Sequence, residues 1–278
     1  MLYTVVVVTF NAEKYIDETL QSLLAQQCEN YEVVVIDGAS KDLTVKKILD
    51  KKKEFENKNI PFQIVSESDD GIYNAMNKGI KLAKGEYIYF LNAGDVLYDE
   101  SVFEKLQTII KNNIKDVYYG DTLCINDFFY KKFEALPIEK ISEDFPFCHQ
   151  SVIVKRELML KYGFDEKYKI CADYDFFIKI YMCGAQFEYV NFIFSKYRMN
   201  GFSSFDDGRQ FWVERIDIRS KWFGWDEKKK KNESRHAMND IRKQKMARIL
   251  KWILPEKVLY YFRVWHGKKE GWFEVKID

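Results

Sequence analysis

Apolar residues alternate between strand-like and helix-like spacing through the first part of the chain. A continuous apolar run over residues 2–9, with four consecutive valines in its middle, predicts a strand buried on both faces. Residues 12–27 follow with helical spacing, and residues 31–36 form a second apolar strand. A helix over 43–57 and a strand over 62–65 continue this alternation. The pattern predicts an α/β fold with a mostly parallel central sheet and helices on both faces.

The stretch from residue 66 to residue 95 is the centre of this pattern. Residues 69–71 form a polar turn, with Asp70 as the expected cap of a helix over 72–83. A short strand at 86–91 then ends abruptly on Asn92-Ala93-Gly94-Asp95. Ligands of open α/β sheets bind outside the carboxyl ends of the strands. We therefore expect the polar turn and the acidic loop to face one crevice.

A dinucleotide-binding domain is the obvious competing fold. That fold carries a GxGxxG turn after its first strand, where the glycines let the backbone approach a pyrophosphate. This chain has TFNAEK at the same place. The sequence therefore excludes that class.

The amino-acid composition limits the size and class of the protein but does not indicate its function. The 278 residues suffice for one large core, or for one domain with a tail, and the net charge of +1 favours no particular partner. The five cysteines form no CxxC pair, which predicts a reduced, cytoplasmic protein. The opening apolar run is short for a signal peptide, and nowhere do eighteen apolar residues follow one another. We expect a chain that is neither secreted nor membrane-spanning.

The pattern changes beyond about residue 206, where aromatic and basic residues accumulate. Residues 226–270 hold 14 Lys and Arg against 6 Asp and Glu, a local excess of +8. Basic residues beside Trp, Leu and Phe in the apolar segments 246–254 and 258–265 suit a helix on an anionic membrane surface. The alternative is a helical tail that packs on the main domain or forms a homo-oligomer. A nucleic-acid partner is not expected, because no binding motif accompanies the charge. The predicted domains are residues 1–205 and the tail 206–278.

Several short motifs in a fixed order carry a family resemblance. They are Thr9-Phe10-Asn11, Asp37-Gly38-Ala39-Ser40 with Thr44, the turn at 69–77, LNAGD at 91–95, CHQSVIVKRE at 148–157, GFDEKYKICADYDFFIK at 163–179 and KYRMNGFSS at 196–204. Together they resemble the family 2 glycosyltransferases, especially bacterial enzymes of O-antigen, capsule and exopolysaccharide assembly. The resemblance covers about residues 1–205 and implies the GT-A nucleotide-sugar-binding fold.

The resemblance also implies an activity and its partners. It implies inverting transfer of a hexose or N-acetylhexosamine from a nucleotide-sugar, with UDP the expected nucleotide. The implied acceptor is a polyprenyl-diphosphate-linked glycan at the inner face of the cell membrane, where the enzyme would be peripheral. The alternative is a catalytically degenerate transferase that binds nucleotide or acts as a scaffold subunit.

Donor-binding residues are expected at the strand ends. The resemblance gives Asp37 the nucleotide base, and Thr9 and Asn11 would line the same pocket. Asp69 or Asp70 would close the pocket from the other side, while the other of the two caps the helix. Asn77 would lie on the helix face nearest the donor, although a polar helix residue is often only solvated.

Asp95 is the expected metal ligand. A diphosphate leaving group develops negative charge, which Mg²⁺ or Mn²⁺ neutralises with few protein ligands and several waters. Where the family commonly has a DxDD-like run, this chain has Asn92-Ala93-Gly94-Asp95, with a single carboxylate. The alternative role for Asp95 is to cap a helix over 101–112.

Asp173 is the expected general base. An inverting transfer needs a base that takes the proton as the acceptor hydroxyl attacks C1 of the sugar. The family's Glu-Asp pair is here Ala172-Asp173, so the aspartate that acts in the family remains. The competing role is a helix cap, and a helix N-terminus would lower the pKa of this carboxyl. A base at this position therefore needs a partly apolar setting.

Further residues are expected around the acceptor and the diphosphate. His149 and Gln150 are candidates for acceptor binding, although a lone histidine at a strand start is as often structural. Arg198 is the expected partner of the diphosphate, with a surface salt bridge as its alternative role. Residues 200–204 resemble a loop that closes over the donor in related enzymes.

Overall fold

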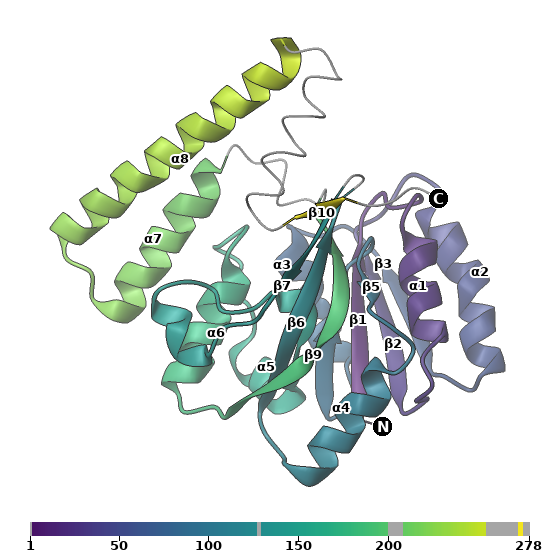
Figure 1. The fold of residues 1–278 in the computed structure, drawn as a ribbon. Helices are drawn as coiled ribbons and strands as arrows, with labels where there is room; N and C mark the ends of the chain where they lie inside the picture. Colours follow the sequence, from purple (N-terminus) through teal and green to yellow (C-terminus); the bar gives the residue numbers. More distant parts are fainter. Residues whose placement is uncertain (1, 127–128, 200–207, 254–271, 275–278) are drawn as a thin grey trace. The chain divides into compact units, whose positions relative to one another are not determined.

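The computed structural model describes residues 2–126, 129–199, 208–253 and 272–274 (Figure 1). The chain forms two compact units. The first comprises Met1–Leu123 and Phe133–Tyr197, and the second comprises Cys124–Lys132 and Arg198–Asp278. The predicted boundary between residues 205 and 206 stays a prediction.

The first unit alternates strands and helices as predicted. Its elements are β1 (Tyr3–Thr9), α1 (Ile16–Leu24), β2 (Tyr31–Asp37), α2 (Thr44–Asn57), β3 (Phe62–Ser66), α3 (Ile72–Leu82), β4 (Tyr87–Phe90), β5 (Val96–Leu97), α4 (Val102–Asn112), β6 (Val117–Ile125), the 3₁₀ turns η1 (Ile138–Ser142) and η2 (His149–Ser151), β8 (Val152–Lys155), α5 (Arg156–Tyr162), α6 (Ala172–Met182) and β9 (Phe187–Arg198).

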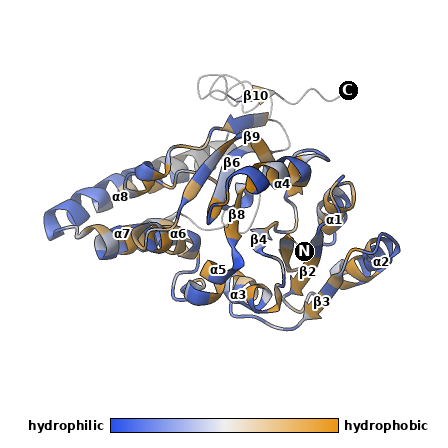
Figure 2. Ribbon diagram, turned by 90° about the horizontal axis from the view of Figure 1, so that it is seen from below, coloured by the Kyte–Doolittle hydropathy of each residue, from blue (hydrophilic) through white to orange (hydrophobic). Residues whose placement is uncertain are grey.

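The sheet has a parallel core with antiparallel strands beside it. Strands β3, β2, β1 and β4 are neighbours in that order and run parallel. Beyond β4 the order continues through β8 and then β6, each antiparallel to its neighbour, and β5 pairs antiparallel with β9. Helices cover both faces of this sheet, with α1 and α2 on one side and α3 and α5 on the other (Figure 2). The predicted fold class is confirmed.

Strand β1 shows why this sequence forms a central parallel strand. Val5 and Val7 lie fully buried in the core cluster that includes residues of α1 and α4. Val6, on the opposite face, lies so close to α3 that a Cβ on Gly79 would come within 2.3 Å of its Cγ1. A strand covered on both sides needs apolar residues at consecutive positions, and the valine run supplies them.

Two local expectations are wrong. The first helix is shorter than the predicted 12–27, because Ala12–Tyr15 forms a turn in which the Ala12 carbonyl accepts from the N–H groups of Tyr15 and Ile16. Asp70 does not cap α3: the cap position is Gly71, whose φ of 121° favours glycine and which has no side chain to cap the helix.

The second unit contains β7 (Phe129–Phe133), α7 (Arg209–Phe223), α8 (Glu227–Ile253) and β10 (Phe273–Glu274). Helices α7 and α8 pack on each other, and β10 pairs antiparallel with β7. Most of α8 is hydrophilic (Figure 2). No helix in the described parts of the chain is long and apolar enough to cross a membrane. The predicted segment 258–265 and the loop 200–204 lie outside the described residues.

Candidate active site

The carboxyl ends of β1, β2 and β3 meet at Asp37. Register pairs Thr9 of β1 with Asp37 of β2, and Asp37 with Ser66 of β3. The buried Asp37 carboxylate accepts hydrogen bonds from Ser40 N at 3.0 Å, Ser40 Oγ at 2.5 Å and Ser66 Oγ at 2.6 Å. This carboxylate therefore fixes the loop after β2 against β3. We call Asp37, Gly38, Ser40 and Ser66 the Asp37 corner.

Asn11 and Thr9 adjoin the Asp37 corner from β1. Asn11 has a left-handed backbone with φ 47°, donates its N–H to Ser40 Oγ at 2.8 Å and accepts from Lys41 N at 2.9 Å through Oδ1. Its side chain thus holds the neighbouring loop in place. Thr9 Oγ1 is buried, and no group in the described residues forms a hydrogen bond with it. A buried hydroxyl of this kind is a candidate for contact with a bound molecule.

Asp69 and Phe10 lie over Gly38. A Cβ on Gly38 would come within 2.7 Å of Asp69 Oδ2 and 3.3 Å of Phe10 Cδ2. Asp69 Oδ1 accepts from Gly71 N at 3.0 Å, which makes an Asx turn before α3. Asp70 instead is exposed, and its backbone carbonyl accepts from Lys169. Of the two aspartates, Asp69 is the one beside the Asp37 corner.

The loop after β4 runs alongside β1. Leu91 N donates to Val6 O and Ala93 N to Val8 O, so Asn92–Asp95 follows the end of β1. The hydroxyl of Thr19 accepts from Gly94 N at 2.9 Å and donates to Asp95 O at 2.8 Å. Asp95 is buried in this loop, whereas the cap position of α4 is Ser101, six residues later. The alternative that Asp95 caps that helix is wrong.

The protein offers few ligands for a metal ion near Asp95. Within the described residues, no group of three or more His, Cys, Asp or Glu side chains could hold one. Asn92 Oδ1, in the same loop, is nevertheless buried, and none of the described residues forms a hydrogen bond with it. One buried carboxylate in this loop fits an ion that takes most of its ligands from phosphate and water.

Asp173 is held in a second group of side chains, which we call the Asp173 cluster: Tyr73, Asn92, His149 and Asp173. Asp173 is the second residue of α6, and its Oδ1 accepts from Tyr73 Oη and from Tyr174 N, both at 2.9 Å. His149 Nδ1 lies 3.6 Å from Asp173 Oδ2, and His149 Nε2 lies 3.3 Å from Asn92 Nδ2. The cluster joins α6, α3, η2 and the loop after β4.

Burial sets the protonation of the cluster. Burial raises the pKa of Asp173 against the opposing effects of His149 and the Tyr73 hydrogen bond, in a side chain only 13% exposed. Burial lowers the pKa of His149, although Asp173 opposes this. Because Asn92 donates to Nε2, the neutral imidazole carries its hydrogen on Nδ1, toward Asp173. The partly apolar setting that a base needs is therefore present around Asp173.

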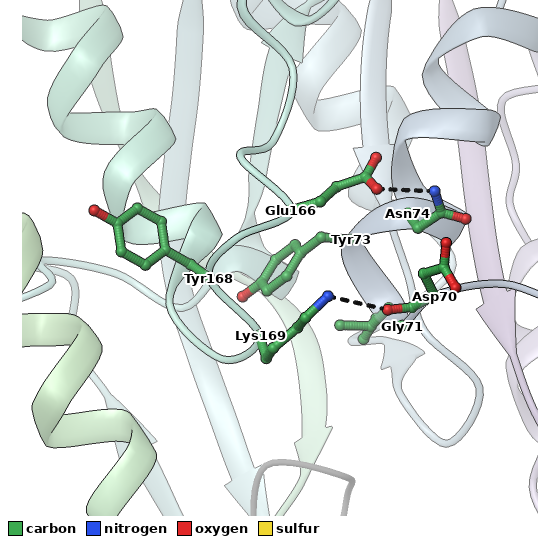
Figure 3. A pocket seen from close by; sticks show the side chains of 8 residues that line it. Asp70, Gly71, Tyr73, Asn74, Glu166, Tyr168 and Lys169 are labelled. Atoms are coloured by element: carbon green, nitrogen blue, oxygen red, sulfur yellow. Dashed lines mark hydrogen bonds between the residues drawn. The ribbon is translucent and has the colours of Figure 1, made fainter.

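Helix α3 is tied to the loop that leads into α6. Asn77 donates to Phe164 O at 3.0 Å and Glu166 Oε1 at 2.8 Å, and accepts from Phe164 N at 2.9 Å. Figure 3 shows the neighbouring contacts from Asn74 to Glu166 and from Lys169 to the Asp70 carbonyl around a small pocket. The Asn77 amide is thus engaged in holding this loop, and its predicted contact with a donor stays a prediction.

Two further predicted site residues, Gln150 and Arg198, belong to different units of the chain. Gln150 is buried beside His149, and its carbonyl accepts from Tyr89 Oη at 2.6 Å. Arg198 ends β9 and belongs to the second unit. The roles proposed for Gln150 in acceptor binding and for Arg198 at the diphosphate stay predictions.

The sequence alone does not single out Phe10, Tyr73 or Asn92 as site residues. Phe10 is 63% exposed beside Gly38, and an aromatic residue in a polar turn is the signal that points to it. Tyr73 follows the apolar pattern of its helix, so its contact with Asp173 leaves no local trace. Asn92 stands out in the sequence only as part of its loop, although its amide lies 3.3 Å from the imidazole of His149.

Comparison with known proteins gives a family and relatives. The model of the family described as "Glycosyl transferase family 2" matches residues 4–184. A PGL/p-HBAD biosynthesis glycosyltransferase of Mycobacterium bovis is 29% identical over 183 residues, 65% of this chain and 70% of the relative. The UDP-Glc:alpha-D-GlcNAc-diphosphoundecaprenol beta-1,3-glucosyltransferase WfgD of Escherichia coli is 28% identical over 204 residues, 72% of this chain and 78% of the relative.

Solved structures share the fold at low identity. S. aureus TarS 1-349 in complex with UDP-GlcNAc aligns with a TM-score of 0.62 at 21% identity, over 78% of this chain and 65% of that one. The mannosyltransferase PcManGT of Pyrobaculum calidifontis, in complex with GDP-Man and Mn²⁺, aligns with a TM-score of 0.62 at 16% identity, over 95% of this chain and 80% of that one. At these levels of identity, the similarity shows a shared fold.

Proposed function

Because the chain belongs to glycosyl transferase family 2 and has the GT-A fold, we propose that it is an inverting transferase that uses Asp173 as its base. The donor would be a UDP-linked hexose or N-acetylhexosamine, and the acceptor a lipid-linked oligosaccharide. One observation carries this proposal: a buried carboxylate with a raised pKa lies within one cluster with His149 and the loop after β4. A carboxyl whose pKa is raised above its ordinary value is a stronger base and is suited to take a proton.

The Asp37 corner suits the nucleotide. The exposed ring of Phe10 offers a stacking surface beside Gly38, and the buried Thr9 hydroxyl bonds none of the described residues. Asp37 and Asp69 supply carboxylate acceptors for base or ribose hydrogens. The UDP-GlcNAc bound by TarS and the UDP-Glc in the name of WfgD support a uridine donor.

The transfer would proceed as a single displacement. The acceptor hydroxyl oxygen attacks C1 of the sugar, and its proton passes to Asp173. The bond between C1 and the diphosphate oxygen breaks, and its electron pair leaves with the nucleoside diphosphate. The transition state resembles an oxocarbenium ion, as in other glycosyl chemistry.

Asp95 would anchor a divalent cation. Mn²⁺ or Mg²⁺ bound there would offset the charge of the diphosphate. The chain's own part is to hold one buried carboxylate on a loop fixed by Thr19. The Mn²⁺ in the PcManGT complex supports this assignment.

Two observations support the proposed lipid-linked acceptor: the name of one relative and the basic tail of the chain. The diphosphoundecaprenol in the name of WfgD supports a polyprenyl-diphosphate-linked glycan, with His149 and Gln150 near its reacting end. The basic helix α8 suits an anionic membrane surface, which would place the protein at the inner face of the cell membrane. Assembly with a second copy through α7 and α8 is the competing use of the tail.

A degenerate transferase is the second candidate. The single carboxylate of the loop 92–95 and Ala172 in place of glutamate favour it. It would bind UDP without transferring sugar.

Asp173→Asn tests the proposed function. The amide keeps the size of the carboxylate but accepts no proton, so kcat should fall by roughly two to four orders of magnitude while UDP affinity stays near normal. Asp165→Asn, at a partly exposed position of the loop before α6, is the control and should transfer normally. Near wild-type transfer by Asp173→Asn would rule out the base. Tight UDP binding without turnover by the wild type, over a panel of UDP-sugars and acceptors, would favour the degenerate transferase.

A further inference from the structure

Tyr73 connects the turn beside the Asp37 corner to Asp173. It is the second residue of α3, two positions after Gly71, whose N–H bonds Asp69. Its ring is buried against Phe164 with a centroid separation of 5.4 Å. Its hydroxyl lies 2.9 Å from Asp173 Oδ1 and 2.7 Å from Ile170 O. A phenol has one hydrogen for these two acceptors.

The two oxygens of Asp173 are not equivalent. Oδ1 receives both the Tyr73 hydroxyl and the N–H of Tyr174. The backbone N–H of Asp173 itself also stabilises the ionised carboxylate, and Oδ2 faces the imidazole of His149 at 3.6 Å. Two donors fill the in-plane lone pairs of Oδ1, so the basic electron pair that remains accessible is on Oδ2.

We infer that Tyr73 is a positioning residue that holds Oδ1 of Asp173 and thereby makes Oδ2 the oxygen that takes the proton of the acceptor hydroxyl. This inference rests on the proposed function. The Tyr73 hydrogen stays on its phenol throughout. When Oδ2 gains the proton, Oδ1 loses most of its charge, and the Tyr73 hydroxyl can turn its hydrogen to Ile170 O. The carbonyl therefore receives the hydrogen bond that the neutral acid no longer attracts.

The same contact adjusts the basicity of Asp173. The titratable groups that face this carboxyl are Tyr73 from α3 and His149 from η2, and Cys171 faces Tyr73. Burial raises the pKa of Asp173, whereas the hydrogen bond from Tyr73 lowers it. Tyr73 therefore keeps the carboxyl ionised at a lower pH than its burial alone would allow.

Tyr73→Phe tests the inference through the pH profile of kcat/KM. The ring and its packing on Phe164 stay, while the charge-stabilising donor is lost. The acid limb should move upward by roughly one pH unit, with a fall of about tenfold at pH values below the limb. Tyr31→Phe is the matched control, because it also removes a buried hydroxyl bonded to a carbonyl, that of Leu23 at 2.7 Å. Its limb should coincide with that of the wild type.

A second variant moves the limb in the opposite direction. Replacing Tyr73 by 3,5-difluorotyrosine makes the phenol a stronger donor, so the limb should shift to lower pH. A purely structural role for Tyr73 would lower activity equally at all pH values and leave the limb in place. If the limb stays in place in both Tyr73 variants while Asp173→Asn is inactive, the role inferred for Tyr73 is wrong and the proposed function stands. Full activity of Asp173→Asn would instead overturn the proposed function.

Discussion

The buried surroundings of Asp173 disfavour the ionised carboxylate, and the stability of the folded protein therefore depends on pH. Its pKa is raised above the ordinary value of 3.8 in the folded protein. The folded state therefore favours the protonated acid. The contribution of this group to stability is fully present below pH 3.8 and is lost as the pH rises through the folded pKa.

Asp173→Asn should therefore gain thermal stability relative to the wild type as the pH increases. The amide is neutral at every pH and avoids the cost of burying a charge. Thermal unfolding of both proteins between about pH 4 and pH 8 measures the effect, with Asp165→Asn as the reference for a partly exposed carboxylate. Melting temperatures of wild type and Asp173→Asn that run parallel over this range would contradict the raised pKa.

Asp95 leads to a prediction about metal binding. Asp95→Asn should weaken Mn²⁺ binding in the presence of UDP by roughly a hundredfold, since even residues that only support a metal ligand contribute ten- to a hundredfold. Titration calorimetry with UDP alone and with UDP and Mn²⁺ separates the ion from the nucleotide. Asp99→Asn is the control, because Asp99 is half-exposed and bonds Ser101 and Lys105 instead. Unchanged Mn²⁺ affinity in Asp95→Asn would remove Asp95 from the metal site.

The role of some single residues can be predicted from the sequence, whereas the role of others cannot. Asp37 and Asp173 stand where a strand ends and where a helix begins, so position alone makes them candidates. Tyr73 meets Asp173 across 100 residues of sequence, and the apolar spacing of α3 explains a tyrosine there without any reference to that contact. Its role follows only from the tertiary structure.

At the scale of elements, the loop after β2 leads to a prediction about the donor. Gly38→Ala would place a Cβ within 2.7 Å of Asp69 Oδ2 and force that side chain aside. UDP affinity should fall by roughly ten- to a hundredfold if Asp69 contacts the nucleotide, because hydrogen bonds to charged groups contribute about 1.5–3 kcal/mol. Gly184→Ala is the control for a glycine replacement: apart from the adjacent residues, no atom of the described chain lies within 4 Å of the added Cβ, although its φ of 86° adds strain. Normal UDP binding by Gly38→Ala, measured by calorimetry, would argue against Asp69.

The parallel half of the sheet follows from sequence, and the antiparallel half does not. Strands β1, β2 and β4 are apolar at consecutive positions because helices cover both faces, and that signal is local. The pairing of β8 with β4 and β6 depends on contacts between segments far apart in the chain. The predicted strand over 151–154 gives no information about its neighbours. The turn at Ala12–Tyr15 shows the same limit, since helical spacing continues through residues that form no helix.

The whole molecule divides its charge unevenly. A net charge of +1 conceals the excess of +8 over residues 226–270, so the remaining chain is acidic. In α8, Lys228 and Lys231 are exposed, while Lys230 pairs with Glu227 at 2.9 Å. An acidic catalytic region would be repelled by an anionic membrane, and a basic tail would be attracted to it.

The full-length protein with Lys228→Glu and Lys231→Glu tests this use of the tail. Each surface lysine contributes about 1 kcal/mol to attraction by anionic lipid, so two charge reversals should lower vesicle affinity by more than tenfold at low salt. Cosedimentation with vesicles of phosphatidylglycerol and phosphatidylcholine measures it, and pure phosphatidylcholine vesicles are the control. Lys51→Glu and Lys140→Glu, in the first unit, match the change in net charge without touching the tail. Equal loss of binding in both pairs would mean that net charge alone governs attraction. The wild type could instead fail to bind anionic vesicles and sediment as a dimer that the α8 substitutions weaken. That result would assign the tail to contact between copies of the chain.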